Sequence, residues 1–156
     1  MLPTRPVLFI VPLIVILVLS LYYRDLYTKC TEIRQYRDAL NDFLQSTDGS
    51  AQFRLVDFTD FSWDTVRIVT GLKAAPRSLE CPLDWNWKSG ERESLVSSGL
   101  LTAVIFGRQD SIVRYLELRG DEVAFRGVDS ILESSRAVFK VDRQTGSGGV
   151  TLVLEN

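Results

Sequence analysis

The sequence begins with a long run of apolar residues that carries no charge. No acidic or basic side chain occurs from Pro6 to Tyr23, and Val7 to Leu19 is entirely aliphatic or aromatic apart from Pro12. As an α-helix, the uncharged segment spans about 27 Å, close to the thickness of the hydrocarbon layer of a bilayer. Residues 1–23 are therefore predicted to form a membrane anchor. The alternative is a buried core helix of a soluble protein.

The end of the apolar run offers no cleavage site for a signal peptidase. Leu21-Tyr22-Tyr23-Arg24 lacks the small residues that such a site requires, so the anchor is expected to stay attached. Basic residues are fewer before the run than after it, which by the positive-inside rule favours a cytoplasmic domain. However, a short basic stub ahead of an apolar run is typical of a signal-anchor, and a long following domain translocates largely regardless of its charges. We therefore expect an extracytoplasmic domain.

After the anchor, the apolar positions follow the period of a helix. Between Arg24 and Ser46 they are spaced by three, four or seven residues, at Leu26, Cys30, Ile33, Leu40 and Leu44. This stripe predicts an amphipathic linker helix, residues 24–46, that continues the membrane helix and packs one face on the domain. Thr47-Asp48-Gly49-Ser50 predicts the end of the helix, with Gly49 in a left-handed cap.

From residue 52 onwards, apolar and polar positions mostly alternate, which predicts strands. The segments with this period are Gln52–Phe58, Thr65–Thr70, Leu101–Phe106, Ile112–Leu118, Val123–Phe125, Ala137–Val141 and Val150–Leu154. Hairpins are expected across residues 107–110 and 145–149, and a helical turn from Glu91 to Ser98. The predicted fold class is α+β: a transmembrane helix, an amphipathic helix, then a mainly antiparallel, sheet-rich domain, residues 47–156, with one face covered by the helix.

Charge and composition narrow the chemistry. The chain has 156 residues, of which 18 are basic and 20 acidic, and the two signs are interleaved, so no nucleic-acid partner is expected. Histidine is absent, which removes the usual general base and the commonest transition-metal ligand. No enzyme, cofactor or metal site is therefore predicted. The residual enzymatic hypothesis rests on Asp57, Asp60 and Asp64, for which turn and cap roles are favoured.

Two further features concern cysteine and tryptophan. Cys30 and Cys81 are the only cysteines, and they either form a disulfide in an oxidising compartment or remain two unpaired thiols. Trp85 and Trp87 face the same way if their segment is extended, and such paired rings often anchor an interface. The predicted partner-binding residues are Leu83, Trp85, Trp87 and Lys88. The alternative is that both rings cover the core from a long loop.

The segment Phe61–Ile68 reads F-S-W-D-T-V-R-I. With the hairpin around Phe106 and Gly107, it resembles a group of small bacterial envelope proteins, mostly of unassigned function, that carry an F-x-W-D-x-V-x-I motif after a signal sequence or anchor. The resemblance covers Phe53 to Leu154, and it implies that the motif begins a strand and that the domain is periplasmic. This sequence departs from the group by its linker helix and its tryptophan-rich loop. In plan, it also resembles membrane-tethered immunity proteins that neutralise toxins in the bacterial envelope.

The sequence thus predicts a single-pass protein of the bacterial inner membrane with a periplasmic domain that binds another protein. An immunity or inhibitor protein is the expected type, with a toxin, a hydrolase or an envelope subunit as partner. The alternative is a structural or assembly subunit of an envelope complex, in which the membrane helix and the 24–46 helix make the essential contacts.

Overall fold

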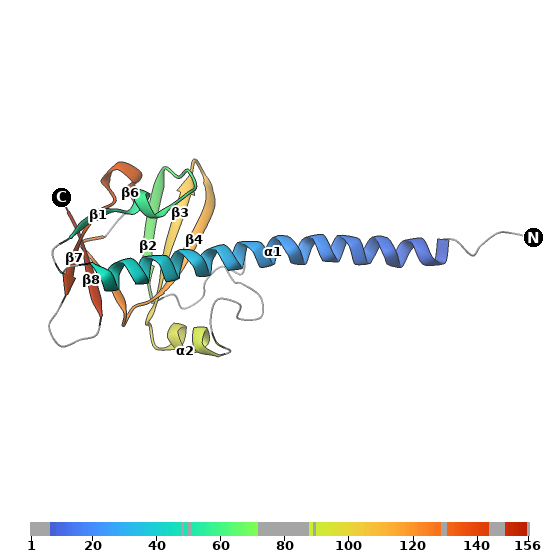
Figure 1. The fold of residues 1–156 in the computed structure, drawn as a ribbon, viewed down its shortest axis with the longest axis horizontal. Helices are drawn as coiled ribbons and strands as arrows, with labels where there is room; N and C mark the ends of the chain where they lie inside the picture. Colours follow the sequence, from blue (N-terminus) through green and yellow to red (C-terminus); the bar gives the residue numbers. More distant parts are fainter. Residues whose placement is uncertain are drawn as a thin grey trace, which may run out of the picture.

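The computed structural model describes residues 7–47, 49, 51–71, 88, 90–128, 131–143 and 149–155, with the side chains of residues 7–9 and 29 left aside. Its first element is one continuous helix of 40 residues, α1 (Val7–Ser46), which contains Pro12 and no glycine. The predicted membrane anchor and the predicted linker helix are therefore two halves of a single helix. Its N-terminal half projects away from the domain (Figure 1).

The projecting half of α1 is apolar and uncovered. Leu13 is 70% exposed and Leu17 57%, and none of the most apolar 18-residue window of the helix is buried. A core helix of a soluble protein is buried on at least one face, so this arrangement disfavours that alternative. The helix is long and apolar enough to cross a membrane.

The C-terminal half of α1 is part of the domain. Cys30, Ile33, Leu40 and Leu44 are between 1% and 4% exposed, which confirms the predicted apolar stripe. The predicted left-handed cap at Gly49 is wrong, since the backbone there does not adopt a positive φ. Instead, the guanidinium of Arg143 donates hydrogen bonds to the last carbonyl groups of the helix.

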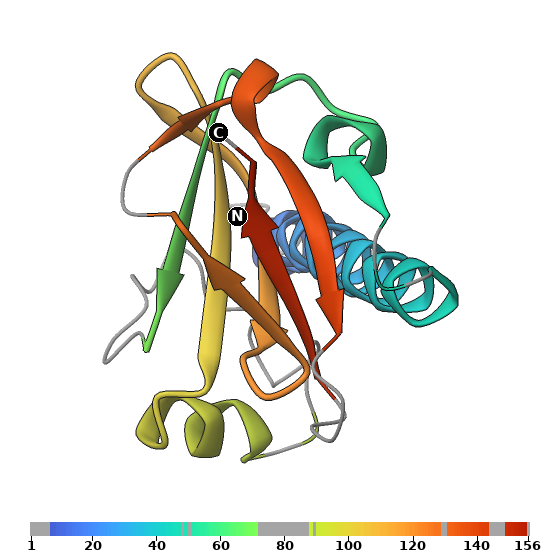
Figure 2. The same cartoon turned by 90° about the vertical axis from the view of Figure 1, so that its left-hand side faces the viewer.

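The strands form two four-stranded sheets. The first has the order β1 (Gln52–Arg54), β7 (Val138–Arg143), β8 (Val150–Leu154), β5 (Val123–Arg126), and the second β4 (Ser111–Arg119), β3 (Leu101–Arg108), β2 (Thr65–Thr70), β6 (Leu132–Glu133). All pairs are antiparallel except β5 with β8. Figure 2 shows α1 running along one side of both sheets.

The structure confirms the α+β class and the antiparallel pairing of both predicted hairpins, β3 with β4 and β7 with β8, while most of the predicted turn at residues 145–149 lies outside the described residues. Three details of the prediction are wrong. The strands form two sheets, whereas a single sheet was predicted. Leu55–Phe58 is a 3-10 helix, η1, and not the end of the strand predicted from Gln52 to Phe58. The short strand β6 was not predicted. The helical turn predicted from residue 91 is the helix α2 (Glu91–Ser97), and a further 3-10 turn, η4, covers Ser134–Arg136.

The core lies between the facing sides of the two sheets and α1. The first sheet contributes Phe53, Phe139, Val141 and Leu152, the second Val66, Val104, Phe106 and Leu116, and the helix Leu40 and Leu44. Aromatic rings meet edge to face within this core, for example Phe43 with Phe58 at 4.6 Å between centroids. Burial of this apolar surface stabilises the folded domain, so the C-terminal half of α1 is an integral layer of it.

Candidate functional site

The junction between α1 and the domain is fixed by polar contacts as well as by apolar packing. The Tyr36 hydroxyl donates a hydrogen bond to the Asp60 carboxylate, and the Arg114 guanidinium lies 3.3 Å from the Glu32 carboxylate and 5.9 Å from the centre of the Phe61 ring. Burial, together with the hydrogen bond to Asp60, raises the pKa of Tyr36 to about 12. The phenol is therefore neutral at physiological pH and serves as a donor.

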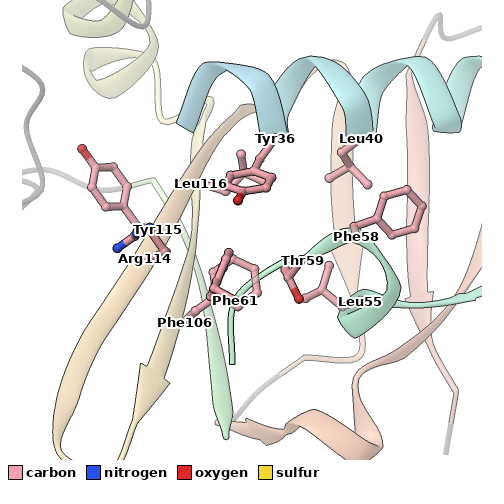
Figure 3. Close-up of a pocket in the computed structure, with 10 residues that line it drawn as sticks. All are labelled: Tyr36, Leu40, Leu55, Phe58, Thr59, Phe61, Phe106, Arg114, Tyr115 and Leu116. Atoms are coloured by element: carbon pink, nitrogen blue, oxygen red, sulfur yellow. The ribbon is translucent and has the colours of Figure 1, made fainter. Parts of the chain in front are cut away.

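A small cavity lies beneath this junction (Figure 3). Its volume is about 20 Å³, and its walls are formed by Tyr36, Leu40, Leu55, Phe58, Thr59, Phe61, Phe106, Arg114, Tyr115 and Leu116. The Tyr115 ring points away from the cavity, so the lining is mainly apolar. A cavity of this size holds about one water molecule and is far below the roughly 300 Å³ of small-ligand sites. It is a packing defect of the junction rather than a ligand site.

A larger, polar hollow opens on the other side of α1. Its volume is about 430 Å³, which lies within the usual range of ligand sites. Its described lining consists of Arg34, Arg37, Asp38 and Asn41 from α1, Lys88 just before α2 and Glu91 at its start, Arg119 at the end of β4, and Glu122 after that strand. We call this feature the polar hollow. It brings together three parts of the chain that are far apart in sequence.

Arg119 organises one wall of the polar hollow. Its guanidinium donates to both carboxylate oxygens of Asp121, at 3.1 and 2.9 Å, and to Glu91 at 2.8 Å, and it lies 3.3 Å from Glu122. The hydrogen bonds from Arg119 lower the pKa of Asp121, and the same bonds raise the pKa of Arg119. Both groups therefore carry their charge at neutral pH.

The described lining of the hollow carries charges of both signs. It includes four basic and three acidic side chains, and Asp121, which Arg119 binds, adds a fourth carboxylate beside it. Lining acids lie beside lining cations, Asp38 beside Arg37 at 3.1 Å and Glu91 beside Arg119. Such an arrangement suits a partner with polar and charged groups.

The helix α2 sets the position of Lys88. The Glu91 amide donates to the Lys88 carbonyl at 2.9 Å, and the Glu91 carboxylate accepts from the Lys88 amide at 3.3 Å. The helix is held on the second sheet by Leu95, which packs on Leu101, and by the ion pair of Arg92 with buried Glu117. Lys88 is exposed at the edge of this fixed element.

Of the four residues predicted to bind a partner, the structure describes Lys88, which lines the polar hollow. Leu83, Trp85 and Trp87 lie outside the described residues, so their role stays a prediction. Cys30 is 2% exposed and disulfide-bonded. The only other cysteine in the chain, Cys81, also lies outside the described residues.

The three aspartates considered for catalysis occupy separate places. Asp57 is exposed on η1, Asp60 accepts the hydrogen bond from Tyr36, and Asp64 accepts one from the Gln109 amide at 3.3 Å. Gln109 has a positive φ of 54°, so the contact with Asp64 supports a strained turn. Within the described ranges, no group of three or more cysteine or carboxylate side chains is placed to hold a metal ion.

The motif Phe61–Ile68 is mainly structural. Strand β2 begins inside it at Thr65, as expected. The Trp63 ring is 5% exposed, its indole N–H donates to the Thr59 hydroxyl at 2.8 Å, and Val66 is buried. Phe61 packs edge to face on Tyr36 and Phe106. The motif therefore joins the second sheet to α1.

Comparison with known protein families, curated proteins and solved structures found no match for the chain. The function is therefore argued from the geometry of the site. The polar hollow was not predicted from the sequence. The available signal was the spacing of Arg34 and Arg37, which are three residues apart and therefore lie on the same face of the predicted helix. No local pattern in the sequence indicates that Arg119 lines this hollow, because β4 and α1 come together only in the folded domain.

Proposed function

We propose that this chain is a membrane-anchored module that binds another protein on the extracytoplasmic side of a bacterial inner membrane. The observation that carries the proposal is the polar hollow, a ligand-sized depression lined by charged side chains and built on the same helix that continues into the apolar anchor. The disulfide bond of Cys30 supports the periplasmic side, since such bonds form and persist in oxidising compartments.

The chemistry of the polar hollow favours a protein partner over a small molecule. Sites for small molecules are mostly apolar and enclose their ligand, whereas the described part of this lining consists of charged side chains and one asparagine. Charged rims of this kind determine which partner associates and how fast. An immunity or inhibitor protein, with a toxin, a hydrolase or an envelope subunit as its partner, fits this chemistry.

The test is recovery of a specific partner from solubilised membranes. The intact protein is purified in mild detergent as wild type, as Lys88→Glu and as Lys140→Glu, the last a matched charge reversal at an exposed position of β7. A partner that co-purifies with wild type and Lys140→Glu, but is at least tenfold depleted with Lys88→Glu, supports the proposal. Equal recovery with all three proteins removes the polar hollow from consideration. A Trp85→Ala/Trp87→Ala variant tests the predicted loop in the same way.

A second candidate is a structural or assembly subunit of an envelope complex. The unbroken course of α1 from the anchor into the core favours it, because a rigid connection holds subunits in a fixed geometry. The apolar face of residues 24–46 is occupied by the chain's own core, which leaves the span as the contact surface. Exchange of residues 1–23 for an unrelated anchor discriminates: a binding module keeps its partner, and an assembly subunit loses its complex.

A further inference from the structure

We infer that the disulfide bond of Cys30 controls the polar hollow, which takes its binding shape only when this bond is closed. The inference rests on the proposed function and names the regulation of its site. Binding then depends on export of the domain to an oxidising compartment, where such bonds form and persist.

Cys30 lies on the same face of α1 as the lining of the polar hollow. The lining residues of this helix follow Cys30 by 4, 7, 8 and 11 residues, at Arg34, Arg37, Asp38 and Asn41. These spacings return to one face of an α-helix. The Cys30 side chain is 2% exposed, so it is enclosed at the end of this stripe that is nearer the apolar anchor. The disulfide therefore lies where the α1 wall of the hollow begins.

The bond also restrains the opposite wall of the hollow, which carries Lys88. Cys30 is disulfide-bonded, and Cys81 is the only other cysteine in the chain, so within one molecule the two are joined to each other. A disulfide holds its two Cα atoms within about 7 Å. Lys88 follows Cys81 by seven residues, a length that spans at most about 25 Å. The closed bond thus limits how far the Lys88 wall can move away from α1.

The wall that carries Lys88 has few other attachments that fix the width of the hollow. Its helix, α2, has seven residues and no side-chain cap at its start, and helices this short depend on tertiary contacts. Leu95 packs on Leu101 in a cluster that is separate from the main core, and the ion pair of Arg92 with Glu117 attaches α2 to β4 and not to α1. A region with so little buried apolar surface opens at a low free energy. We expect this wall to move first when the disulfide is open.

The control acts as the chain matures. Closing the bond takes one proton and one electron from each of the two thiols, and the disulfide oxidant of the compartment is reduced to a dithiol. A dithiol reductant reverses the step by exchange, which gives two cysteine thiols and a cyclic disulfide of the reductant. Because Cys30 is buried, exchange in the folded domain is slow, and a bond once formed stays closed. A chain on the reducing side of the membrane therefore has an incomplete hollow.

The experiment measures the width of the hollow in the full chain in non-ionic detergent. Ketone-bearing residues, which take spin labels that do not react with thiols, replace exposed Gln35 on α1 and exposed Glu93 on α2. A control pair joins Gln35 to exposed Lys140 on β7, across the main core. Double electron–electron resonance gives the distance distribution of each pair. The proteins compared are the oxidised chain, the Cys30→Ser/Cys81→Ser variant, and wild type refolded from urea in dithiothreitol.

We expect the distribution for Gln35 with Glu93 to be at least twofold wider in the serine variant and in the reduced chain than in the oxidised chain. The control pair should keep its width. Equal widths of the first pair in all three proteins overturn the inference. Broadening of both pairs also overturns it, because the bond then holds the whole domain together rather than the hollow.

Recovery of a partner from solubilised membranes separates failure of the inference from failure of the proposed function. A partner that co-purifies with wild type, but is at least tenfold depleted with the serine variant and with Lys88→Glu, supports both. Equal recovery with wild type and the serine variant, together with depletion by Lys88→Glu, overturns the inference and leaves the proposed function standing. Equal recovery with all three proteins shows that the hollow is not the binding site and overturns both.

Discussion

Two nitrogens of the Arg92 guanidinium donate hydrogen bonds to the Glu117 carboxylate. The Arg92 Nε lies 3.0 Å from both carboxylate oxygens and Nη2 lies 2.7 Å from Oε1, while the Glu117 side chain is only 3% exposed. Glu117 lies on β4, an edge strand of the second sheet, opposite Ala103 of β3, so the pair joins α2 to this strand. It holds in place the helix whose first turn positions Lys88.

Removing one partner of this pair should destabilise the domain strongly. Arg92→Ala leaves the Glu117 carboxylate buried without its counter-charge, and such changes cost about 3 to 5 kcal/mol. The measurement is urea unfolding of the full chain in non-ionic detergent. Replacing both partners at once, as in Arg92→Met/Glu117→Leu, should recover most of the loss, since no charge then remains buried. A single variant as stable as wild type would show that the pair contributes little.

Shortening the core residues of α1 should unfold the domain more easily than shortening residues of its anchor. Leu44 is 1% exposed, and Leu44→Ala should cost about 2 to 5 kcal/mol because it leaves a cavity in the core between α1 and the sheets. Leu17 is 57% exposed, and Leu17→Ala is the matched control, with no change in domain unfolding expected. Equal effects of the two substitutions would contradict the assignment of α1 to the core.

Arg143 should be needed at the C-terminal end of α1. It donates to the carbonyls of Gln45 at 2.9 Å and Thr47 at 2.8 Å, and also to that of Leu44. Hydrogen bonds from charged groups contribute about 1.5 to 3 kcal/mol, and because Arg143 is exposed we expect about 1 kcal/mol for Arg143→Ala. Hydrogen exchange of the last helical turn provides the measurement. Lys140→Ala, on the same strand, should leave that exchange unchanged.

Stability should fall in alkali through Tyr36. Its folded pKa is about 12 against an ordinary value of 10.0, so between pH 10 and 12 the unfolded chain loses the Tyr36 proton while the folded chain retains it. The contribution is fully present below pH 10 and is lost as the pH rises through 12. Unfolding followed from pH 9 to 12 should therefore show a shallower loss for Tyr36→Phe than for wild type. Parallel curves for the two proteins would rule out this role for Tyr36.

The chain purified from an oxidising compartment should contain no free thiol. Cys30 is bonded, and a bridge to Cys81 would close a loop of about 50 residues, worth about 3 to 4 kcal/mol in the chain-entropy model. Alkylation before and after reduction, followed by mass spectrometry, counts the thiols. Cys30→Ser should lower the unfolding midpoint to that of the reduced wild type. Alkylation of unreduced, folded protein would contradict the bond.

Several elements could be read from the sequence because their signal is local. The apolar stripe at Ile33, Leu40 and Leu44 identified the buried face of α1, and alternation identified β2 and both hairpins. The side-chain period of a helix or strand and the turn residues between neighbouring strands are enough for such elements. Lys88 was predicted to bind a partner on a local signal too, its position next to Trp85 and Trp87 in the sequence.

The sequence alone determined the uncharged span, the amphipathic continuation and the α+β class, since each depends on periodicity within one segment. The tertiary structure decided the division into two sheets, the parallel pairing of β5 with β8, the burial of Glu117, and the meeting of Arg34 and Arg119 in one hollow. Those features join residues that are distant in the chain. Their formation depends on which non-local contacts offset the entropy of closing long loops, and no local pattern of apolar and polar residues records that choice.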